Sequence, residues 1–114
     1  MSDITPFLKS LISVAGLSGF EAPVGKLIKQ KWTPLVDEVS ESKLGSIHGR
    51  KTATLKGHIR QAPSVLIATH MDAIGLMVSR IVDEFLYITN IGGIDSRVLP
   101  GTPVTVHASG TNED

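Results

Sequence analysis

The chain has 114 residues, 11 basic and 11 acidic side chains, a formal net charge of zero and no cysteine. This length corresponds to about one small domain with a core of its own. The balanced charge gives no electrostatic indication of a nucleic-acid or membrane partner, and the lack of cysteine excludes disulfides and zinc–thiolate sites. No stretch is apolar for long enough to cross a bilayer, and the first ten residues lack the pattern of a secretion signal, so we expect a cytoplasmic protein.

The first predicted helix begins after Thr5, which is expected to cap it. Pro6 is then its first residue, where a missing N–H group costs nothing, and Gly16 is expected to end it. The apolar residues of this segment follow helical spacing and form one stripe that consists of Ile4, Phe7, Leu8, Leu11, Ile12 and Ala15.

A second helix is predicted after the sequence Ser18-Gly19-Phe20-Glu21. These four residues have the form of a capping box, but a proline deep in the first turns of a helix would cost a hydrogen bond. We therefore place them in a turn and begin the helix near Pro23. It ends before Pro34, because the residue before a proline avoids helical angles. Its buried stripe is expected to be Val24, Leu27, Ile28 and Trp32, with Trp32 as an anchor at the helix end rather than a platform for a ligand.

From residue 36 onward the apolar period is two, which is typical of β-strands. Strands are predicted at 36–42, 47–51, 52–56, 74–82, 85–91 and 104–108. Turns are predicted at Lys43–Ser46, at Asp83-Glu84 in a hairpin, and at Val98–Gly101. His48 and His58 lie among polar residues and are expected at the surface, and 109–114 is expected to be a frayed tail.

The stretch Ala62–Gly75 organises the chain. Ser64–Thr69 is a short apolar run rich in β-branched residues and bounded by Pro63, which predicts a strand buried on both faces of a parallel or mixed sheet. His70 and Asp72 follow at its carboxyl end, where chemistry collects in open α/β sheets. Because side chains alternate along a strand, both residues can face one crevice.

Two interpretations of His70-Met71-Asp72 are open at this point. The imidazole could ligate a metal through one nitrogen, while the carboxylate fixes its tautomer through the other nitrogen or ligates the metal itself. The histidine could instead be a satisfied side chain in a turn, because H-x-D spacing alone is common. The apolar strand directly before the motif favours the metal site.

The predicted layout is incomplete for a parallel sheet. Only two helices are predicted and both precede the central strand, whereas parallel strands need crossover connections of a dozen residues or more. The second half is typical of an antiparallel β unit without closing strands. Two half-built units indicate the opening part of something larger.

Four signatures along the chain point to one family. They are Ser18-Gly19-Phe20-Glu21; Val36-Asp37-Glu38-Val39 followed by Leu44-Gly45; His70-Met71-Asp72-x-Ile74-Gly75 with Met77-Val78; and Ile91-Gly92-Gly93-Ile94-Asp95 followed by Arg97-Val98-Leu99. In order and spacing the chain resembles the N-terminal part of the dinuclear-metal aminopeptidases, which include glutamyl aminopeptidases, deblocking aminopeptidases and tetrahedral archaeal enzymes, some with the older label "endoglucanase M".

The resemblance implies an α/β fold that opens a mixed-sheet metallopeptidase domain. Residues 1–72 would begin this catalytic domain, and residues 73–114 would begin an inserted β-rich, barrel-like dimerisation domain. His70 would be a ligand of one of two divalent metal ions, zinc or cobalt. Asp72 would be the catalytic-site partner that orients its ring. Peptides would be the substrates, and the family assembles into homo-oligomers.

The chain departs from the family pattern in places. Ala73 stands where the family usually has an acidic residue, and Ser46 replaces a usual asparagine. The other metal ligands and the glutamate general base of the family lie beyond residue 114. Because a catalytic zinc ordinarily takes three protein ligands, no tightly bound metal is expected in this chain alone.

Two functions are therefore predicted as alternatives. In the first, the chain is a truncated form of a metal-dependent aminopeptidase that hydrolyses N-terminal residues of peptides through a water activated by two metals, and it is inactive alone. In the second, it is a non-catalytic module that oligomerises or binds a partner through its uncovered strands.

Overall fold

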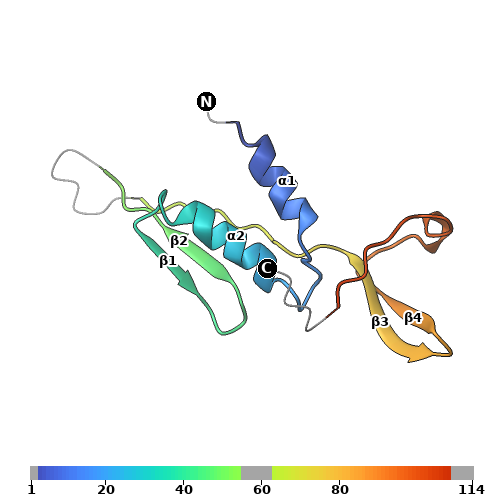
Figure 1. Cartoon of the computed structure of the whole chain (residues 1–114). Helices are drawn as coiled ribbons and strands as arrows, with labels where there is room; N and C mark the ends of the chain where they lie inside the picture. Colours follow the sequence, from blue (N-terminus) through green and yellow to red (C-terminus); the bar gives the residue numbers. More distant parts are fainter. Residues whose placement is uncertain (1–2, 55–62, 109–114) are drawn as a thin grey trace. The chain divides into compact units, whose positions relative to one another are not determined.

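The computed structural model describes residues 3–54 and 63–108 of the chain. The chain divides into two compact units, Met1–Asp72 and Ala73–Asp114, and each is described by itself. The first contains helices α1 and α2 and the strand pair β1–β2, and the second contains the strand pair β3–β4 and a short 3-10 helix, η1 (Figure 1). This is a small mixed α/β arrangement. In the described part of the chain both sheets are antiparallel and two-stranded, so the predicted parallel or mixed sheet is not formed there.

Helix α1 spans Thr5–Ser13 and carries its proline in the first turn, as predicted. The predicted cap was wrong, because the Asp3 carboxylate accepts the Thr5 N–H group at 2.9 Å and satisfies the helix start in place of the Thr5 side chain. The helix also ends before Gly16, at Val14, whose backbone is extended. Three of the six residues in the predicted stripe, Ile4, Leu8 and Ile12, are exposed, and the other three are partly covered.

Helix α2 spans Ala22–Trp32, close to the predicted bounds. Among the described residues Val24, at 4% exposure, is the one apolar side chain that is buried, and the other residues of its predicted stripe are partly covered. Trp32 packs at the helix end over Gly49, where an added Cβ would lie 3.0 Å from the indole ring. The predicted helix-end anchor is therefore confirmed.

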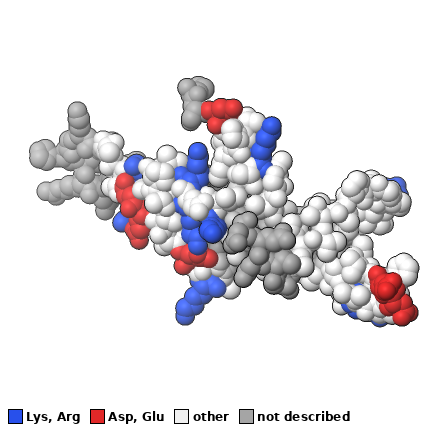
Figure 2. Space-filling model, in the orientation of Figure 1, with Lys and Arg blue, Asp and Glu red and all other residues white. Residues whose placement is uncertain are grey.

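Strands β1, Glu38–Glu41, and β2, Ile47–Arg50, form an antiparallel hairpin, with Glu38 opposite Arg50 and Glu41 opposite Ile47. The predicted turn at 43–46 joins them. Lys29 of α2 forms an ion pair of 2.6 Å with Glu41, which links the helix to the hairpin. On the face shown in Figure 2, basic and acidic side chains are interspersed over this unit.

The predicted central strand is not formed. Residues 63–72 belong to no strand, and Val65, Leu66 and Ile67 are 86, 90 and 87% exposed. The physical reason is the lack of pairing, because in the described part of the chain β1 and β2 pair only with each other, as do β3 and β4. An apolar run becomes a strand only when neighbouring strands satisfy its backbone groups.

Strands β3, Gly75–Val82, and β4, Phe85–Ile91, form the predicted hairpin. Asp83 and Glu84 turn the chain with φ angles of +47° and +67°, as a type I′ turn requires. The 3-10 helix η1, Ser96–Val98, and a turn at residues 100–101 replace the single predicted turn at 98–101.

The predicted strand at 104–108 is wrong, since these residues are exposed and in no strand. Of the predicted strand at 52–56, residues 52–54 are likewise in no strand, and its last two residues lie outside the described part. His58, Ala62 and the predicted tail at 109–114 also lie outside the described residues. No helix in the described ranges is long and apolar enough to cross a bilayer.

Candidate metal-ligand site

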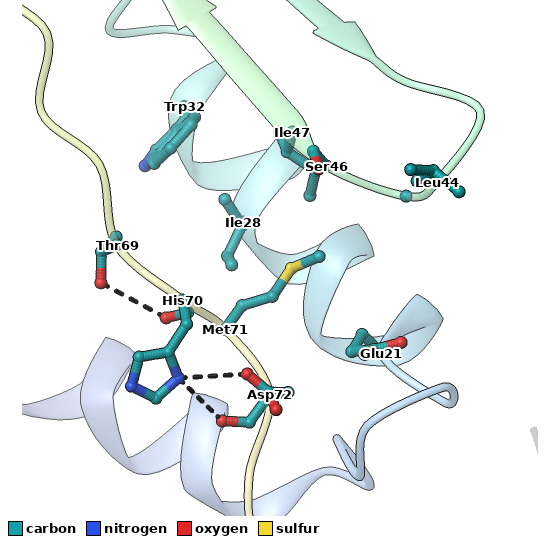
Figure 3. A pocket seen from close by; sticks show the side chains of 11 residues that line it. Glu21, Ile28, Trp32, Leu44, Ser46, Ile47, Thr69, His70, Met71 and Asp72 are labelled. Carbon is teal, nitrogen blue, oxygen red and sulfur yellow. Dashed lines mark hydrogen bonds and ion pairs between the residues drawn. The ribbon is translucent and has the colours of Figure 1, made fainter.

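His70 and Asp72 lie together in the segment that precedes the boundary between the two units. The imidazole Nδ1 lies 3.2 Å from Asp72 Oδ1 and 3.2 Å from the main-chain oxygen of Asp72 (Figure 3). The His70 side chain is 85% exposed and the Asp72 side chain 41% exposed. The alternation expected of a strand is kept locally, since Figure 3 shows the Met71 side chain directed toward α2 and the imidazole directed away from it.

This geometry selects one tautomer of His70. A carboxylate oxygen and a carbonyl oxygen both accept hydrogen bonds and cannot donate them, so Nδ1 must carry a proton. In the neutral ring the other nitrogen, Nε2, then carries a lone pair. A metal-ligating histidine commonly has this arrangement, with a carboxylate on the nitrogen that does not bind the metal.

A second hydrogen bond holds the carboxylate itself. The Ser18 hydroxyl donates to Asp72 Oδ2 at 2.5 Å, so that a residue between the two helices contacts one 54 positions later. This bond is the first cause that lowers the pKa of Asp72 below its ordinary value, with a smaller contribution from His70. Asp72 is therefore ionised at neutral pH and available as an acceptor.

A pocket of about 280 Å³ lies beside the motif and within the first unit (Figure 3). Helix α2 contributes Ile28 and Trp32 to its lining, and the segment 69–72 forms one side. The remaining lining residues are Glu21, Leu44, Gly45, Ser46 and Ile47. The lining of this pocket thus combines apolar side chains with two carboxylates and an imidazole.

The described residues hold no group of three or more His, Asp or Glu side chains placed to bind one metal ion. His70 fits as a single ligand, because Asp72 holds its Nδ1 and none of the residues that the structure describes bonds to its Nε2. His48 lies in β2 opposite Ser40, and no carboxylate of the described residues forms such a contact with its ring.

The sequence interpretation missed Ser18. Its S-x-x-E motif was compared with a capping box, but Glu21 accepts the Gly19 N–H group at 2.8 Å and no side chain caps α2. The Ser-Gly pair was a signal for a tight turn. Nothing in the local sequence could have shown that the hydroxyl in this turn meets Asp72.

Comparison with known proteins finds related aminopeptidases. The family model for M42 glutamyl aminopeptidases matches residues 49–113. The chain is 38% identical over 89 residues to a lysyl aminopeptidase of Pyrococcus furiosus, covering 76% of this chain and 24% of that protein. It is 31% identical over 100 residues to a glutamyl aminopeptidase of Lactococcus lactis, covering 87% of this chain and 27% of that protein.

A solved structure is also similar. The crystal structure of a TET aminopeptidase from a marine sediment Thaumarchaeota archaeon superimposes with a TM-score of 0.69 at 36% sequence identity, over 83% of this chain and 25% of that one. The fold of this chain is therefore similar to part of an aminopeptidase structure. The chain belongs to the M42 glutamyl aminopeptidase family of hydrolases, and it spans about a quarter of the length of the relatives it matches.

Proposed function

We propose that this chain supplies one metal ligand and its orienting carboxylate to the active site of a metal-dependent aminopeptidase. His70 would bind a divalent ion through Nε2, and Asp72 would hold the ring through Nδ1. The observation that carries the proposal is the 3.2 Å contact between His70 Nδ1 and Asp72 Oδ1 in an exposed segment, which leaves Nε2 open.

The complete site would need ligands that the described residues do not provide. A catalytic zinc ordinarily takes three protein ligands, and the described chain offers one imidazole at this place. His70 would hold one of a pair of divalent ions, zinc or cobalt, and that pair would supply activation of a water and polarisation of the scissile carbonyl. The purified chain alone is expected to hold no stoichiometric metal and to leave aminoacyl p-nitroanilides intact.

The division of the chain supports the proposed domain roles. The boundary between the two compact units falls between Asp72 and Ala73, directly after the H-x-D motif. We assign residues 1–72 to the opening of the catalytic domain and residues 73–114 to the opening of an inserted β-rich dimerisation domain. The complete protein would be a cytoplasmic homo-oligomer that takes peptides as substrates.

A chimeric enzyme tests this proposal. These 114 residues would replace the matching segment of the Pyrococcus furiosus lysyl aminopeptidase. We expect the chimera to hydrolyse aminoacyl p-nitroanilides and to bind two divalent ions. His70→Ala should lower turnover by more than about 100-fold. Mutation of a residue that only supports a metal ligand already lowers metal affinity or activity by roughly 10- to 100-fold. His48→Ala, in β2, is the matched control and should retain the activity of the chimera.

Wild-type turnover in the His70→Ala chimera would remove the assignment of the ligand. A chimera that folds and assembles but hydrolyses nothing would favour a second function, a non-catalytic module that pairs with other chains. That alternative has its own support, because Val65, Leu66 and Ile67 are almost fully exposed in a segment that pairs with none of the described strands. Tight stoichiometric metal and turnover in the isolated chain would exclude it.

A further inference from the structure

The two carboxylate oxygens of Asp72 are held by different parts of the first unit. Oδ1 lies 3.2 Å from His70 Nδ1, and Oδ2 accepts the Ser18 hydroxyl at 2.5 Å. The torsion that rotates an aspartate carboxylate is broad and has no deep preferred angle. Hydrogen bonds to both oxygens therefore fix the plane of the Asp72 carboxylate, whereas one hydrogen bond alone would leave the carboxylate free to rotate.

The turn that contains Ser18 has a defined geometry. The Phe20 N–H group donates to the Leu17 carbonyl at 2.7 Å, and Gly19 has a φ angle of +88° while Ser18 has no positive φ. This combination is a type II turn with glycine at its third position, where a left-handed backbone is required. The Glu21 carboxylate accepts the Gly19 N–H group at 2.8 Å and closes the loop. The backbone position of Ser18 is therefore fixed by this turn.

We infer that Ser18 is a positioning residue for the proposed metal ligand. Its hydroxyl fixes the Asp72 carboxylate, and the carboxylate in turn holds the His70 ring with the proton on Nδ1 and the lone pair on Nε2. Ser18 acts through Asp72, since the hydrogen bond that it makes at this site is to the carboxylate and not to the imidazole. The inference rests on the proposed function, because orientation of the ring has a use only if Nε2 binds an ion.

Exposure explains why a second hydrogen bond matters here. The His70 side chain is 85% exposed, so packing does little to hold the ring. A single contact between exposed partners is weak, because holding two mobile side chains in one geometry costs conformational entropy. Ser18 reduces that cost for Asp72 before the ring is bound, because its own turn is already closed by Gly19 and Glu21.

The ring tautomer of His70 provides a direct test. Ring 15N chemical shifts of the metal-free 114-residue chain, recorded at about pH 8.5 where imidazole is neutral, give the fraction of each tautomer. In Ser18→Ala we expect the Nδ1–H fraction to fall toward the value in Asp72→Ala, which sets the largest loss. Ser13→Ala is the matched control, because that hydroxyl donates to the Lys9 carbonyl within α1. It should leave the tautomer of His70 unchanged.

Two nearly isosteric variants separate the hydroxyl from the shape of the side chain. Ser18→Thr should keep the wild-type tautomer, and Ser18→Val should lose it, with the amide spectrum of α2 unchanged in both. Zn²⁺ titration should then show a binding constant for His70 that is weaker by up to about 10-fold in Ser18→Val. A wild-type tautomer in both the alanine and the valine variants would overturn the inference. Wild-type turnover in the His70→Ala chimera, while Ser18→Val still shifts the tautomer in the 114-residue chain, would instead defeat the proposed function and leave the Ser18–Asp72–His70 linkage standing.

Discussion

His70 Nδ1 lies 3.2 Å from Oδ1 of Asp72, and the same nitrogen lies 3.2 Å from the Asp72 main-chain oxygen. The two residues reach this geometry in a segment that is in no strand. The orientation of the ring therefore depends on side-chain and local backbone contacts, and no sheet is needed to produce it.

The roles of these two residues predict different responses to added metal. In the chimeric enzyme, Asp72→Ala should weaken metal binding by about 10- to 100-fold, and excess Zn²⁺ or Co²⁺ should restore much of the turnover. His70→Ala should stay far below wild type at saturating metal, because a ligand itself is missing. Asp95→Ala, which breaks the contact with Arg97 in the second unit, is the control. Equal rescue of the His70 and Asp72 variants would contradict this division of roles.

Gly16 lies in the segment between the two helices and is buried against Val24 of α2. A Cβ added at Gly16 would lie 2.6 Å from Val24 Cγ2, so Gly16→Ala must displace the side chain at the centre of the small core. We expect the free energy of unfolding of the first unit to fall by about 1–3 kcal/mol. Gly93→Ala, where nothing lies within 4 Å, should change stability by less than about 0.5 kcal/mol. Urea denaturation followed by Trp32 fluorescence measures the first unit, and equal stability of Gly16→Ala and wild type would contradict the predicted clash.

The pKa of Asp37 provides a pH test of the hairpin end. The Thr52 amide, which donates at 2.6 Å, the Thr52 hydroxyl and the Lys51 ammonium lower this pKa from 3.8 to about 2. Because the pKa in the folded state is depressed, the contribution of Asp37 to stability is present above about pH 4 and is lost as the pH falls toward 2. The 13C shift of the Asp37 carboxyl should titrate near 2, with the Thr52 amide shifting in step. A midpoint near 3.8 would contradict the contact.

The turn between β3 and β4 places two non-glycine residues in the left-handed region. Glu84 has a φ angle of +67°, which costs a residue with a Cβ about 1–2 kcal/mol. Glu84→Gly should therefore slow amide exchange along β3–β4 by stabilising the hairpin. Asn90→Gly within β4 is the opposite control and should speed exchange, because glycine weakens a strand interior. Faster exchange in Glu84→Gly would show that the turn has another conformation.

The exposed apolar segment predicts association of the isolated chain. Val65, Leu66 and Ile67 form a contiguous apolar run that is 86–90% exposed, and unpaired backbone beside such side chains can pair with another chain. Light scattering should show a molecular mass that rises with concentration, and Leu66→Lys should reduce it. Leu44→Lys, at a single exposed leucine in the β1–β2 turn, should reduce it less. A monomer at all concentrations would count against this prediction.

The sequence predicted the helices and hairpins that form through contacts between neighbouring residues. The position of Pro23 and the stripe from Val24 to Trp32 predicted α2, and the Asp83-Glu84 pair between two apolar runs predicted the β3–β4 hairpin. These elements satisfy their backbone groups within themselves or with an adjacent segment. The sequence could not show whether the apolar run at 64–69 forms a strand, because a strand forms only when it pairs with other strands.

The candidate site shows the same limit. The H-x-D spacing predicted that His70 and Asp72 lie together, because two residues on one short segment need no tertiary information. Ser18 was outside the reach of the sequence, since its partner is 54 residues away. Likewise, residue types alone did not show that the Asp3 carboxylate, rather than the Thr5 side chain, would bond at the start of α1.

The most direct test of the account is a Zn²⁺ titration of the 15N-labelled chain observed at the histidine rings. Nε2 of His70 should respond at lower Zn²⁺ than either nitrogen of His48 or His107, while Nδ1 of His70 keeps its proton. A first response at another histidine, or loss of the Nδ1 proton of His70 to the metal, would contradict the assignment of His70 as the metal ligand held by Asp72.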